Sequence, residues 1–598
     1  MAVDSYPSIV GGFAPPPIVP SGRNFSIAGI AGRSRKGLPF QRITIDKENL
    51  IREVGKAIIG QPEIFQLFAH VNTYRTNVAE FVRVVDLLTA KFPSLELKLA
   101  EALAGTVTIA QGAAAVVGSG TAFLTALIVG QAVTVGGEVH EIKAITDDSN
   151  CELVSTHVTG VTAAAMTKNE WTERADTYDT VITLVTSGIL VSLNDGSNEE
   201  TYGLTITGKT DHELSDETLV PVFTITFHRK IAGTWGAITG ESFMVSLDPD
   251  AKNDRAESLY LPAVLNNENS IFKATLKNDF VDHAEISLIS TPMEFTGATA
   301  GDAPTSPDFQ AGWDLFDGSD SKAMLGTVPN NDQTAAIYAI KLFYDKYCNT
   351  AYNIPDNLDV DAAITHRETI MSGVGIKKRF LAINYGPMSV VSDPFFNLPL
   401  DLDWSGAMTG ASAFGDSGDA AAGKDVGIHS QPAGETRGLI SVFGAAKPKY
   451  SLTGTDLTKL GDVDINWLTI SNTTGACKIN QARIQIGHNV RPKDRLWGVQ
   501  KTQAFMLTWF KDYLGQVQHE SDGVTQKEVI RGGELLKELL LGTKSIYLPS
   551  ADQIVQYGYT EALTTTFLHN SQTGLNDVGL AAYIMGSSEN FKVTVMSV

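Results

Sequence analysis

Acidic side chains that alternate between residues 248 and 254 are the first candidates for chemistry. Asp248, Asp250 and Asp254 stand in the segment Asp-Pro-Asp-Ala-Lys-Asn-Asp, and alternate carboxylates can converge on a hard cation such as Ca²⁺. Lys252 occupies a position where a calcium loop needs an oxygen ligand, and no glycine follows where the loop must turn sharply. We therefore interpret this segment as a β-turn rather than a calcium site.

A serine in the segment Gly415–Asp419 is the next candidate, because the sequence Gly-Asp-Ser-Gly surrounds the nucleophile of chymotrypsin-like serine proteases. Such a serine needs a histidine base and a carboxylate that orients the base. The nearby His429 and the upstream His366 lie in no recognisable protease context. The segment falls within residues 401–434, which are rich in Gly, Ala, Asp and Ser, so we predict a solvated turn in a long surface loop.

Phosphate and metal sites find no support in the remaining motifs. The segment Gly118-Ser119-Gly120 lacks a third glycine and any following Gly-Lys-Ser/Thr sequence. The 11 histidines are scattered without the HxxxH spacing of a helical metal site. Cys151, Cys348 and Cys477 lie far apart, which favours neither a disulfide framework nor a zinc site. We expect no catalytic, cofactor-binding or metal-ligating residues, and therefore no enzyme.

The composition indicates a globular chain of several domains. It has 598 residues, of which 43% are hydrophobic and 19% charged, so about three to five domains are expected. The formal charge of -21 argues against direct binding to nucleic acid, because phosphate neutralisation needs clustered Lys and Arg. We find no signal peptide at the N-terminus and no apolar run near the roughly 18 residues of a spanning helix. The sequence predicts a soluble protein that folds in a reducing cytoplasm.

The first hundred residues predict an arm followed by α/β structure. Residues 1–24 contain a run of prolines and read as an extended arm. Strands are expected at 25–31 and 42–45, and Asp46 is a plausible N-cap for a helix through Val54. Residues 78–103 have a helical composition, and Pro93 must divide that helix.

Two β-rich regions come next, and α/β character returns after residue 330. Short Val, Thr and Ala runs separated by Gly and Asp predict a small all-β module at 106–167, and β structure continues through residue 227. Further on, capping residues and apolar periodicity predict these elements: a helix from Asn330 to Tyr347, strands at 379–383, 465–470 and 482–486, helices at 505–517 and 526–541, and a final strand at 591–598.

We therefore predict a multidomain protein of α/β and α+β class. Its expected parts are an N-terminal extended arm (1–24), a discontinuous middle α/β domain (25–104 plus 330–440), an inserted small β module on the outer surface (105–170), a β-rich domain (171–329), an inner C-terminal α/β domain (441–586) and a C-terminal strand arm (587–598).

Separated segments of the chain resemble, in order, the sheath proteins of contractile bacteriophage tails and contractile injection systems. In the N-terminal half these segments are Ile27–Gly37, Asn49–Gly55, Glu80–Val85, Glu241–Pro249 and Leu259–Asn266. In the C-terminal half they are Lys378–Pro387, Ala420–Asp425, Gln431–Gly438, Asp464–Asn466 and Arg495–Thr502. The chain departs from the family pattern at Leu38, which separates the glycine and proline of a Gly-Pro pair, and residues 105–170 have no counterpart in it.

The resemblance implies a structural subunit without a cofactor. Sheath proteins form hexameric rings stacked helically around a tail tube, meet baseplate and tail terminator proteins, and become part of the virion after assembly in the host cytoplasm. Their chain ends add strands to a sheet of neighbouring subunits. The residues implied in assembly are Phe591, Lys592, Val593, Thr594, Val595 and Met596 in the C-terminal arm, and Ser8, Ile9, Val10, Phe13, Ile18 and Val19 in the N-terminal arm. Candidate tube-facing residues are Lys511, Asp512, Lys537 and Glu538.

Two other classes of protein remain as alternatives. A tail tube or other virion structural protein would also be acidic, β-rich and self-assembling, but such proteins are usually much shorter. A phage surface adhesin or hydrolase would use the small β module for binding, and a hydrolase would need a converging carboxylate or Ser/His set. Length and the last 160 residues favour the sheath interpretation.

Overall fold

The computed structural model shows a mixed α/β protein with several sheets, divided into two compact units. The α/β unit comprises residues 1–34, 40–84 and 305–598, and the β unit comprises residues 35–39 and 85–304. In the part of the chain that the structure describes, no helix is long and apolar enough to span a bilayer. The described residues are 27–73, 77–177, 189–193, 201–213, 219–266, 272–276, 286–299, 301–417, 431–487, 490, 492–514, 530–532, 564–570 and 575–581.

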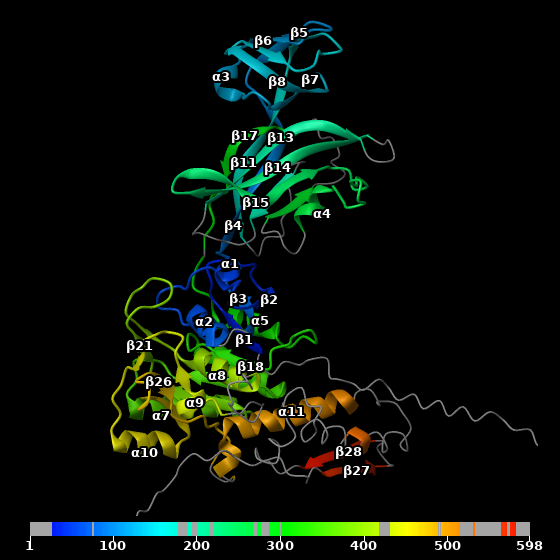
Figure 1. Ribbon diagram of the computed structural model, residues 1–598. Helices are drawn as coiled ribbons and strands as arrows, with labels where there is room; N and C mark the ends of the chain where they lie inside the picture. Colours follow the sequence, from blue (N-terminus) through cyan, green and yellow to red (C-terminus); the bar gives the residue numbers. More distant parts are fainter. Residues whose placement is uncertain are drawn as a thin grey trace, which may run out of the picture. The chain divides into compact units, whose positions relative to one another are not determined.

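A nine-stranded sheet organises the α/β unit (Figure 1). Its central strands β3, β1, β18, β19, β20 and β25 run parallel, and antiparallel strands close both ends. In spatial order the strands are β2 (Arg42–Ile45), β3 (Val78–Arg83), β1 (Ile27–Gly32), β18 (Leu325–Val328), β19 (Asn349–Asn353), β20 (Leu381–Tyr385), β25 (Ile465–Ile470), β26 (Cys477–Ile479) and β23 (Leu439–Ile440).

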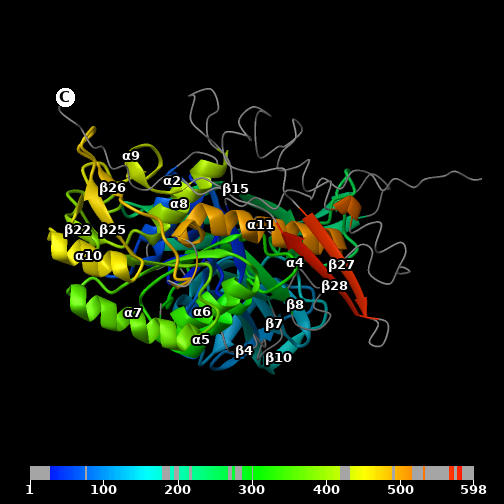
Figure 2. The ribbon, with the colours of Figure 1, turned by 90° about the horizontal axis from the view of Figure 1, so that it is seen from below.

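Helices cover both faces of this sheet, as in doubly wound α/β folds. On one face they are α5 (Ser306–Asp314), α6 (Gln333–Asp345), α7 (Val360–Val374) and α10 (Gly454–Asp462). On the other face they are α1 (Leu50–Val54), α2 (Glu63–Thr73) and α8 (Ser405–Ser417). Figure 2 shows α7 and α10 side by side. The remaining elements of the unit are β21 (Met388–Val390), β22 (Leu400–Leu402), β24 (Lys447–Pro448), α9 (Gly434–Arg437), the 3₁₀ turn Pro492–Arg495, α11 (Trp497–Leu514), β27 (Thr564–Asn570) and β28 (Leu575–Ala581).

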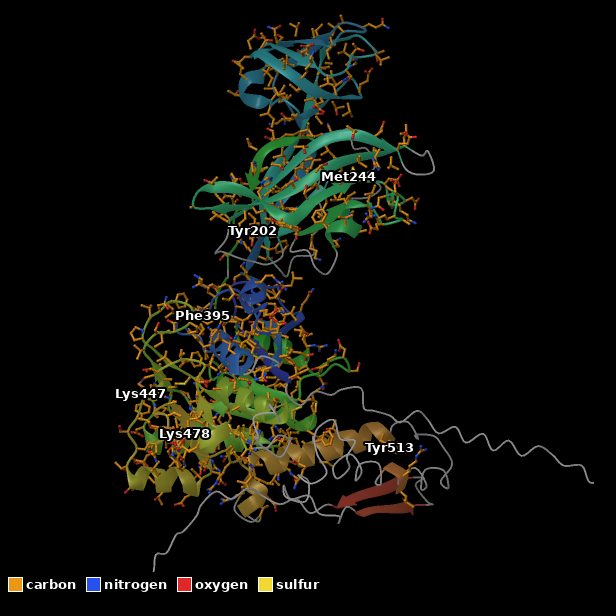
Figure 3. The ribbon with its side chains drawn as sticks, in the orientation of Figure 1. Tyr202, Met244, Phe395, Lys447, Lys478 and Tyr513 are labelled. Atoms are coloured by element: carbon orange, nitrogen blue, oxygen red, sulfur yellow. The ribbon has the colours of Figure 1, made fainter. Side chains whose placement is uncertain are left out.

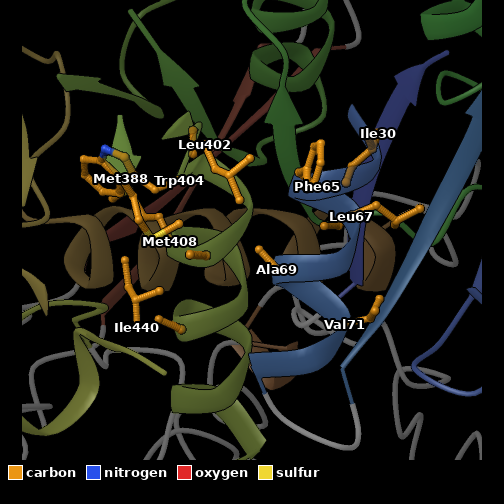
Figure 4. Packing of buried hydrophobic residues seen from close by; sticks show 14 of the residues in the cluster. Ile30, Phe65, Leu67, Ala69, Val71, Met388, Leu402, Trp404, Met408 and Ile440 are labelled. Atoms are coloured by element: carbon orange, nitrogen blue, oxygen red, sulfur yellow. The ribbon is translucent and has the colours of Figure 1, made fainter. Parts of the chain in front are cut away.

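Alternate side chains of the central strands enter opposite cores. Ala28 and Ile30 of β1 pack with α2 and α8, and Ala31 packs on the other side with α5 and α6. Figure 4 shows the first of these cores, in which Ala69 of α2 lies on the side of Met408 and Leu67 points to the opposite side of the helix. Because both faces are covered, β1, β18, β19 and β20 are buried throughout, as expected for parallel strands.

The β unit contains a ten-stranded sheet and a four-stranded sheet. The ten strands in spatial order are β10 (Val161–Ala164), β5 (Thr106–Ile109), β6 (Ala115–Ser119), β9 (Asn150–Leu153), β8 (Glu138–Asp147), β7 (Ala132–Val135), β11 (Met166–Thr177), β4 (Lys91–Ala102), β12 (Ile189–Leu193) and β16 (Phe272–Leu276). The four-stranded sheet contains β15 (Thr234–Val245), β14 (Leu219–Ile231), β13 (Thr201–Glu213) and β17 (Ile289–Glu294), and the short helices are α3 (Phe123–Ala126) and α4 (Leu261–Leu265).

Aromatic packing forms the larger core of the β unit. The rings of Phe227 and Phe272 stack with centroids 3.6 Å apart, and Tyr202 meets Phe272 edge to face at 5.9 Å. Tyr202 and Met244, labelled in Figure 3, come from β13 and β15 of the four-stranded sheet. Strands β5 to β10 and α3 enclose a separate smaller core in the small β module (residues 105–170).

Several predicted elements are confirmed, with boundaries shifted by a few residues. Strands β1, β2, β20 and β25 lie where they are expected, as do the β strands of 201–231. Helix α6 begins after Asp332, whose Oδ1 accepts a hydrogen bond from the backbone N–H of Ala335 at 2.6 Å, as a cap should. The predicted helix at 526–541 is described only at residues 530–532, which are helical, and the strand at 591–598 lies outside the described residues.

The prediction of a helix at 78–103 is wrong. These residues form β3 and β4, and β4 pairs along its length with β11. Leu95 and Leu97 enter the core and alternate with Glu96 and Lys98, and this period of two outweighs a helical composition. Pro93 lies within β4 opposite Ala175.

The prediction of a loop at 401–434 is also wrong over its first half, because Ser405–Ser417 form helix α8. Its small residues allow close contact with α2: a Cβ added to Gly406 would lie 2.1 Å from the backbone oxygen of Gln66, and one added to Gly410 would lie 3.0 Å from that of His70. Figure 4 shows the two helices adjacent. A small-residue segment is thus a core helix here.

The remaining differences concern a strand and the domain boundaries. Ala482–Ile486 form no strand apart from an isolated bridge between Arg483 and Leu496. The expected boundary at residue 440 does not interrupt the fold, because β25 pairs with β20 within one sheet. At the other expected boundary, residues 305–329 belong to the α/β unit rather than to the β-rich domain. The domain boundaries depend on pairing between strands that are distant in the sequence. Local sequence patterns do not reveal this pairing.

Candidate assembly site

The strands β27 and β28 form a two-stranded antiparallel sheet. Each strand has seven residues, and the register runs from Thr564 opposite Ala581 to Asn570 opposite Leu575. Among the described residues neither strand pairs with any other strand. Each strand therefore has one edge at which backbone N–H and C=O groups can accept a further strand.

A two-stranded sheet on its own is marginally stable in water, and a third or fourth strand greatly improves it. The register places Phe567 opposite Val578 and Thr565 opposite Leu580, and β-branched and aromatic cross-strand pairs favour sheet formation. The backbone geometry therefore makes β27 and β28 suited to receive a strand supplied by another chain.

Helix α11 precedes this sheet in the chain, and its first turns are anchored in the core of the α/β unit. Trp497 is buried, and its Nε1 donates to the Ser412 Oγ at 2.8 Å. The amide of Asn349 in β19 donates to the Trp497 carbonyl at 3.1 Å, and the Arg379 guanidinium donates to Gln500 Oε1 at 2.8 Å. These contacts fix where the helix starts.

Two of the predicted assembly residues fall near the end of this helix, and the others lie outside the described residues. Lys511 and Asp512 lie within α11, although their side chains are outside the description. The other implicated residues lie outside the described residues: Ser8, Ile9, Val10, Phe13, Ile18, Val19, Lys537, Glu538, Phe591, Lys592, Val593, Thr594, Val595 and Met596.

Ser412 and Lys501 form a serine–lysine pair that sequence reasoning missed. The Lys501 ammonium donates to Ser412 Oγ at 2.9 Å, a geometry found between a nucleophile and its base. Both side chains are buried, and the same Oγ also accepts the Trp497 indole N–H. We interpret the pair as a polar link between α8 and α11, because a substrate could not reach the hydroxyl without unpacking the helices.

Polar side chains also meet where the strand order changes direction, between β1 and β18. In open α/β sheets this position commonly holds a ligand. Here the Arg33 Nε lies 3.0 Å from the Glu63 Oε1, and the Asn331 amide donates to the same oxygen at 2.6 Å. A Cβ on Gly32 would lie 2.2 Å from the Glu63 side chain. The position is thus filled by an ion pair that ties α2 to the sheet.

A pocket of about 280 Å³ opens near the carboxyl ends of β19 and β20, and Asp356, Asp401 and Asp403 are among its lining residues. Burial raises the pKa of Asp403 to about 7, although hydrogen bonds from Ser405 and Gln66 oppose the shift. Its Oδ1 accepts the Ser405 N–H at 2.9 Å, and its Oδ2 accepts from Gln66 Nε2 at 2.5 Å. Asp403 therefore joins the start of α8 to α2.

The Gly-Asp-Ser-Gly and acidic segments show no catalytic or metal geometry in their described parts. Asp416 and Ser417 lie in the last turn of α8. The Asp248 Oδ1 accepts the backbone N–H of Asp250 at 2.8 Å, which is the side-chain bond of an Asx turn. In the β unit, however, the fold brings Glu138, His140 and His157 together. Sequence reasoning missed this group, and the one available signal is that Glu138 and His140 are two apart on a strand.

No protein family model matches this sequence, and no curated protein matches it. Solved structures that are similar to it include sheath proteins. A sheath tail protein from Listeria innocua shows 10% identity and a TM-score of 0.49, with 94% of this chain and 93% of the other covered. A sheath tail protein from Desulfitobacterium hafniense shows 11% identity and a TM-score of 0.43, with 98% and 99% covered.

A third similar structure is the helical sheath of the anti-feeding prophage in its contracted state. The identity is 14% and the TM-score 0.35, and the match covers 51% of this chain and 78% of the other. The matches to the two sheath tail proteins extend over nearly the whole chain, whereas this match covers about half of it.

Proposed function

We propose that this chain is the structural subunit of a contractile tail sheath and has no enzymatic role. Subunits would polymerise as stacked hexameric rings around a tail tube, and the sheath would contract on baseplate triggering to drive the tube through the host envelope. The ordered resemblance of segments from Ile27 to Thr502 supports this proposal. Its partners would be other copies of the chain, the tube protein, the baseplate and the tail terminator, in a virion assembled in the host cytoplasm.

The observation that carries the proposal is the open two-stranded sheet β27–β28. The sequence from Phe591 to Val598 alternates apolar residues with Lys592 and Thr594, as an added strand requires. Strand addition from the chain ends of neighbours would satisfy the free edges and bury the apolar side of each arm. Links of this kind keep rings connected while rigid subunits rotate.

Energy for contraction would be stored in the extended assembly. The candidate ligand position between β1 and β18 is filled by the Arg33–Glu63–Asn331 cluster, and Asp403 in the pocket is held by Gln66 and Ser405. This favours mechanical work by the assembly over chemistry in the subunit. Lys511 and Asp512 of α11, and Lys537 and Glu538, are proposed to face the tube.

Electron microscopy of the purified full chain tests the proposal directly. Hollow striated cylinders are the expected result. Narrow smooth tubes would instead identify a tail tube protein, and discrete trimers would identify an adhesin; either outcome would overturn the proposal.

Deletion of residues 587–598 tests the arm. We expect a folded subunit that forms no cylinders, because the edge of β27–β28 loses its added strand. A peptide of residues 587–598 should also block polymerisation of the intact chain, whereas a scrambled peptide should not. Long cylinders from the truncated chain would show that the C-terminal arm does not connect subunits.

A matched control removes residues 104–165 from the small β module. The Leu103 N–H donates to the Met166 carbonyl at 3.0 Å, so these two positions are close enough for a short glycine linker. This variant should still form cylinders if the module lies on the outer surface and takes no part in assembly. If this variant formed no cylinders, the small β module would take part in assembly, and the proposed role of the C-terminal arm would be unaffected.

A further inference from the structure

Glu138, His140 and His157 converge in the small β module. Glu138 and His140 lie two residues apart in β8 and thus on one face of the strand. His157 lies in the loop of residues 154–160 that follows β9. The two imidazole rings stack with centroids 5.1 Å apart. One potential ligand atom from each of the three residues lies within 4.8 Å of the others.

The hydrogen bonds of His157 determine which of its nitrogens faces the carboxylate. Its Nε2 lies 3.0 Å from the Val135 carbonyl oxygen, and a carbonyl can only accept, so the Nε2 carries the proton. In the neutral ring the Nδ1 then presents its lone pair to the Glu138 Oε1, 3.4 Å away. Two acceptors that face each other where one of them is buried are unfavourable unless a cation or a proton lies between them.

His140 also faces Glu138, and its other nitrogen lies beside a hydroxyl, which can donate or accept. Its Nδ1 lies 2.9 Å from the Ser155 Oγ, and its Nε2 lies 3.5 Å from the Glu138 Oε2. The His140 and His157 side chains are 4% and 0% exposed. The two nitrogens that face Glu138 are buried and have no hydrogen-bond partner. Both rings therefore direct an unsatisfied nitrogen toward one carboxylate.

Glu138 is held as an anion by the loop that carries His157. The Thr159 hydroxyl donates to the Oε1 at 2.6 Å, the Val158 N–H donates to the Oε2 at 2.8 Å and the Thr159 N–H donates to the Oε1 at 3.1 Å. These bonds lower the pKa of Glu138 to about 2, and the bond from the Thr159 hydroxyl has the largest effect. The carboxylate is 25% exposed, so an ion can reach it from solvent.

We propose that Glu138, His140 and His157 form a binding site for a divalent transition-metal ion of the Zn²⁺ class, with water as the fourth ligand. Two imidazoles and one carboxylate are a common zinc ligand set, and metal–ligand bonds of about 2.0–2.1 Å put tetrahedral ligand atoms about 3.3 Å apart. The His157 Nδ1 lies 3.4 Å from the Glu138 Oε1 and the His140 Nε2 lies 3.5 Å from the Oε2, so each imidazole is near that spacing from one oxygen of the same carboxylate.

The outer partners of the histidines also fit a metal site. Metal-binding histidines usually donate their second N–H to a carbonyl, a carboxylate or water, as His157 does to Val135. The turn Gly136-Gly137, with φ of 59° and 87°, connects β7 to β8 between Val135 and Glu138. A bound ion would fasten the 154–160 loop to this hairpin and stabilise the module.

Zn²⁺ titration of the chelator-treated full chain, followed by calorimetry and elemental analysis, tests the site. We expect His140→Ala and His157→Ala each to bind one fewer ion than the wild type at micromolar concentration. His212→Ala, which changes a histidine in the four-stranded sheet, should bind as the wild type does. Ser155→Ala should keep the site and weaken it about 10- to 100-fold.

Two further measurements separate metal binding from a structural role of the histidines. Co²⁺ should give the visible absorption of a tetrahedral ion in the wild type and lose it in Glu138→Gln, a variant of nearly the same size. Hydrogen exchange in β8 should slow on Zn²⁺ addition. Equal Zn²⁺ binding by wild type and His157→Ala would overturn the proposal. So would protection of β8 that appears only on acidification, since that would indicate a protonated histidine pair.

Discussion

Consecutive residues along β1, β18 and β19 of the α/β unit are buried without a break. In the β unit, by contrast, the middle of β14 alternates between buried and more exposed positions, and β15 is intermediate or exposed except at Val245. The first pattern arises because helices cover both faces of a parallel sheet, and the second because an antiparallel sheet packs on one face only. The α/β unit is therefore the less tolerant of substitution, and the β unit offers free surface.

Substitution of adjacent residues gives the largest expected contrast. Trp467 and Leu468 of β25 enter opposite cores, so Trp467→Ala and Leu468→Ala should each lower the unfolding free energy of the α/β unit by about 2–5 kcal/mol. In β14, Ile225→Ala should cost a similar amount, but the neighbouring Thr226→Ala should change it by less than about 0.5 kcal/mol. Urea unfolding of the full chain measures these effects when proteolytic cleavage in each unit is used as the signal for its unfolding. A silent Leu468→Ala would contradict burial on both faces.

The contact of α2 with α8 gives the next effect. Gly406→Ala should destabilise the α/β unit by about 1–3 kcal/mol, because its Cβ would overlap the Gln66 backbone and the two helices must separate. Gly454→Ala is the control, since no atom lies within 4 Å of its added Cβ. Thermal unfolding should show a lower melting temperature for the first variant and little change for the second. Equal melting temperatures would mean that the helices are not in close contact.

The α/β unit should also depend on pH through Asp403. Its pKa is raised from 3.8 to about 7 by burial, so the folded state holds a proton that the unfolded state releases between these values. The contribution of protonated Asp403 to the unfolding free energy is complete below pH 4. It is lost as the pH rises toward 7, with a slope of at most about 1.4 kcal/mol per pH unit. Asp403→Asn should remove this dependence. Urea unfolding of both proteins at pH 4, 5.5 and 7 measures this pH dependence. If the unfolding free energies of wild type and Asp403→Asn changed equally with pH, Asp403 would be excluded as the cause.

The smallest effects are expected on the exposed side of the four-stranded sheet. Ile231 and Met244 are 59% and 41% exposed, so Ile231→Ser and Met244→Ser should change the unfolding free energy of the β unit by less than about 0.5 kcal/mol. The same unfolding assay applies. A loss near 2 kcal/mol in the monomer would show that this face is covered by other parts of the chain.

The sequence predicts the alternation of elements well where local signals agree. The cap at Asp332, the β-branched strands and the glycine turns of the small β module all lie close in sequence to the elements that they define. Predictions fail where packing decides. Helix α8 depends on a partner helix that approaches Gly406 and Gly410, and β4 depends on β11, some 70 residues away in the chain.

The candidate sites show the same limit. Strands β27 and β28 lie between the predicted helix at 526–541 and the predicted strand at 591–598, where no element is predicted. The Glu138, His140 and His157 group depends on a loop that returns to β8 after an intervening strand, so its members show no regular spacing. The fold of the described α/β unit is thus more predictable than the positions of its contacts with other molecules.

The two ends of the β unit leave the α/β unit close together. The Asp302 N–H donates to the Thr89 hydroxyl at 2.8 Å, and Lys91 and Thr299 exchange backbone hydrogen bonds of 3.0 Å. Residues 85–304 thus form a segment of more than 200 residues whose two ends lie next to each other. Evolution can therefore replace such a segment as a whole while the residues of the doubly wound sheet are inherited unchanged.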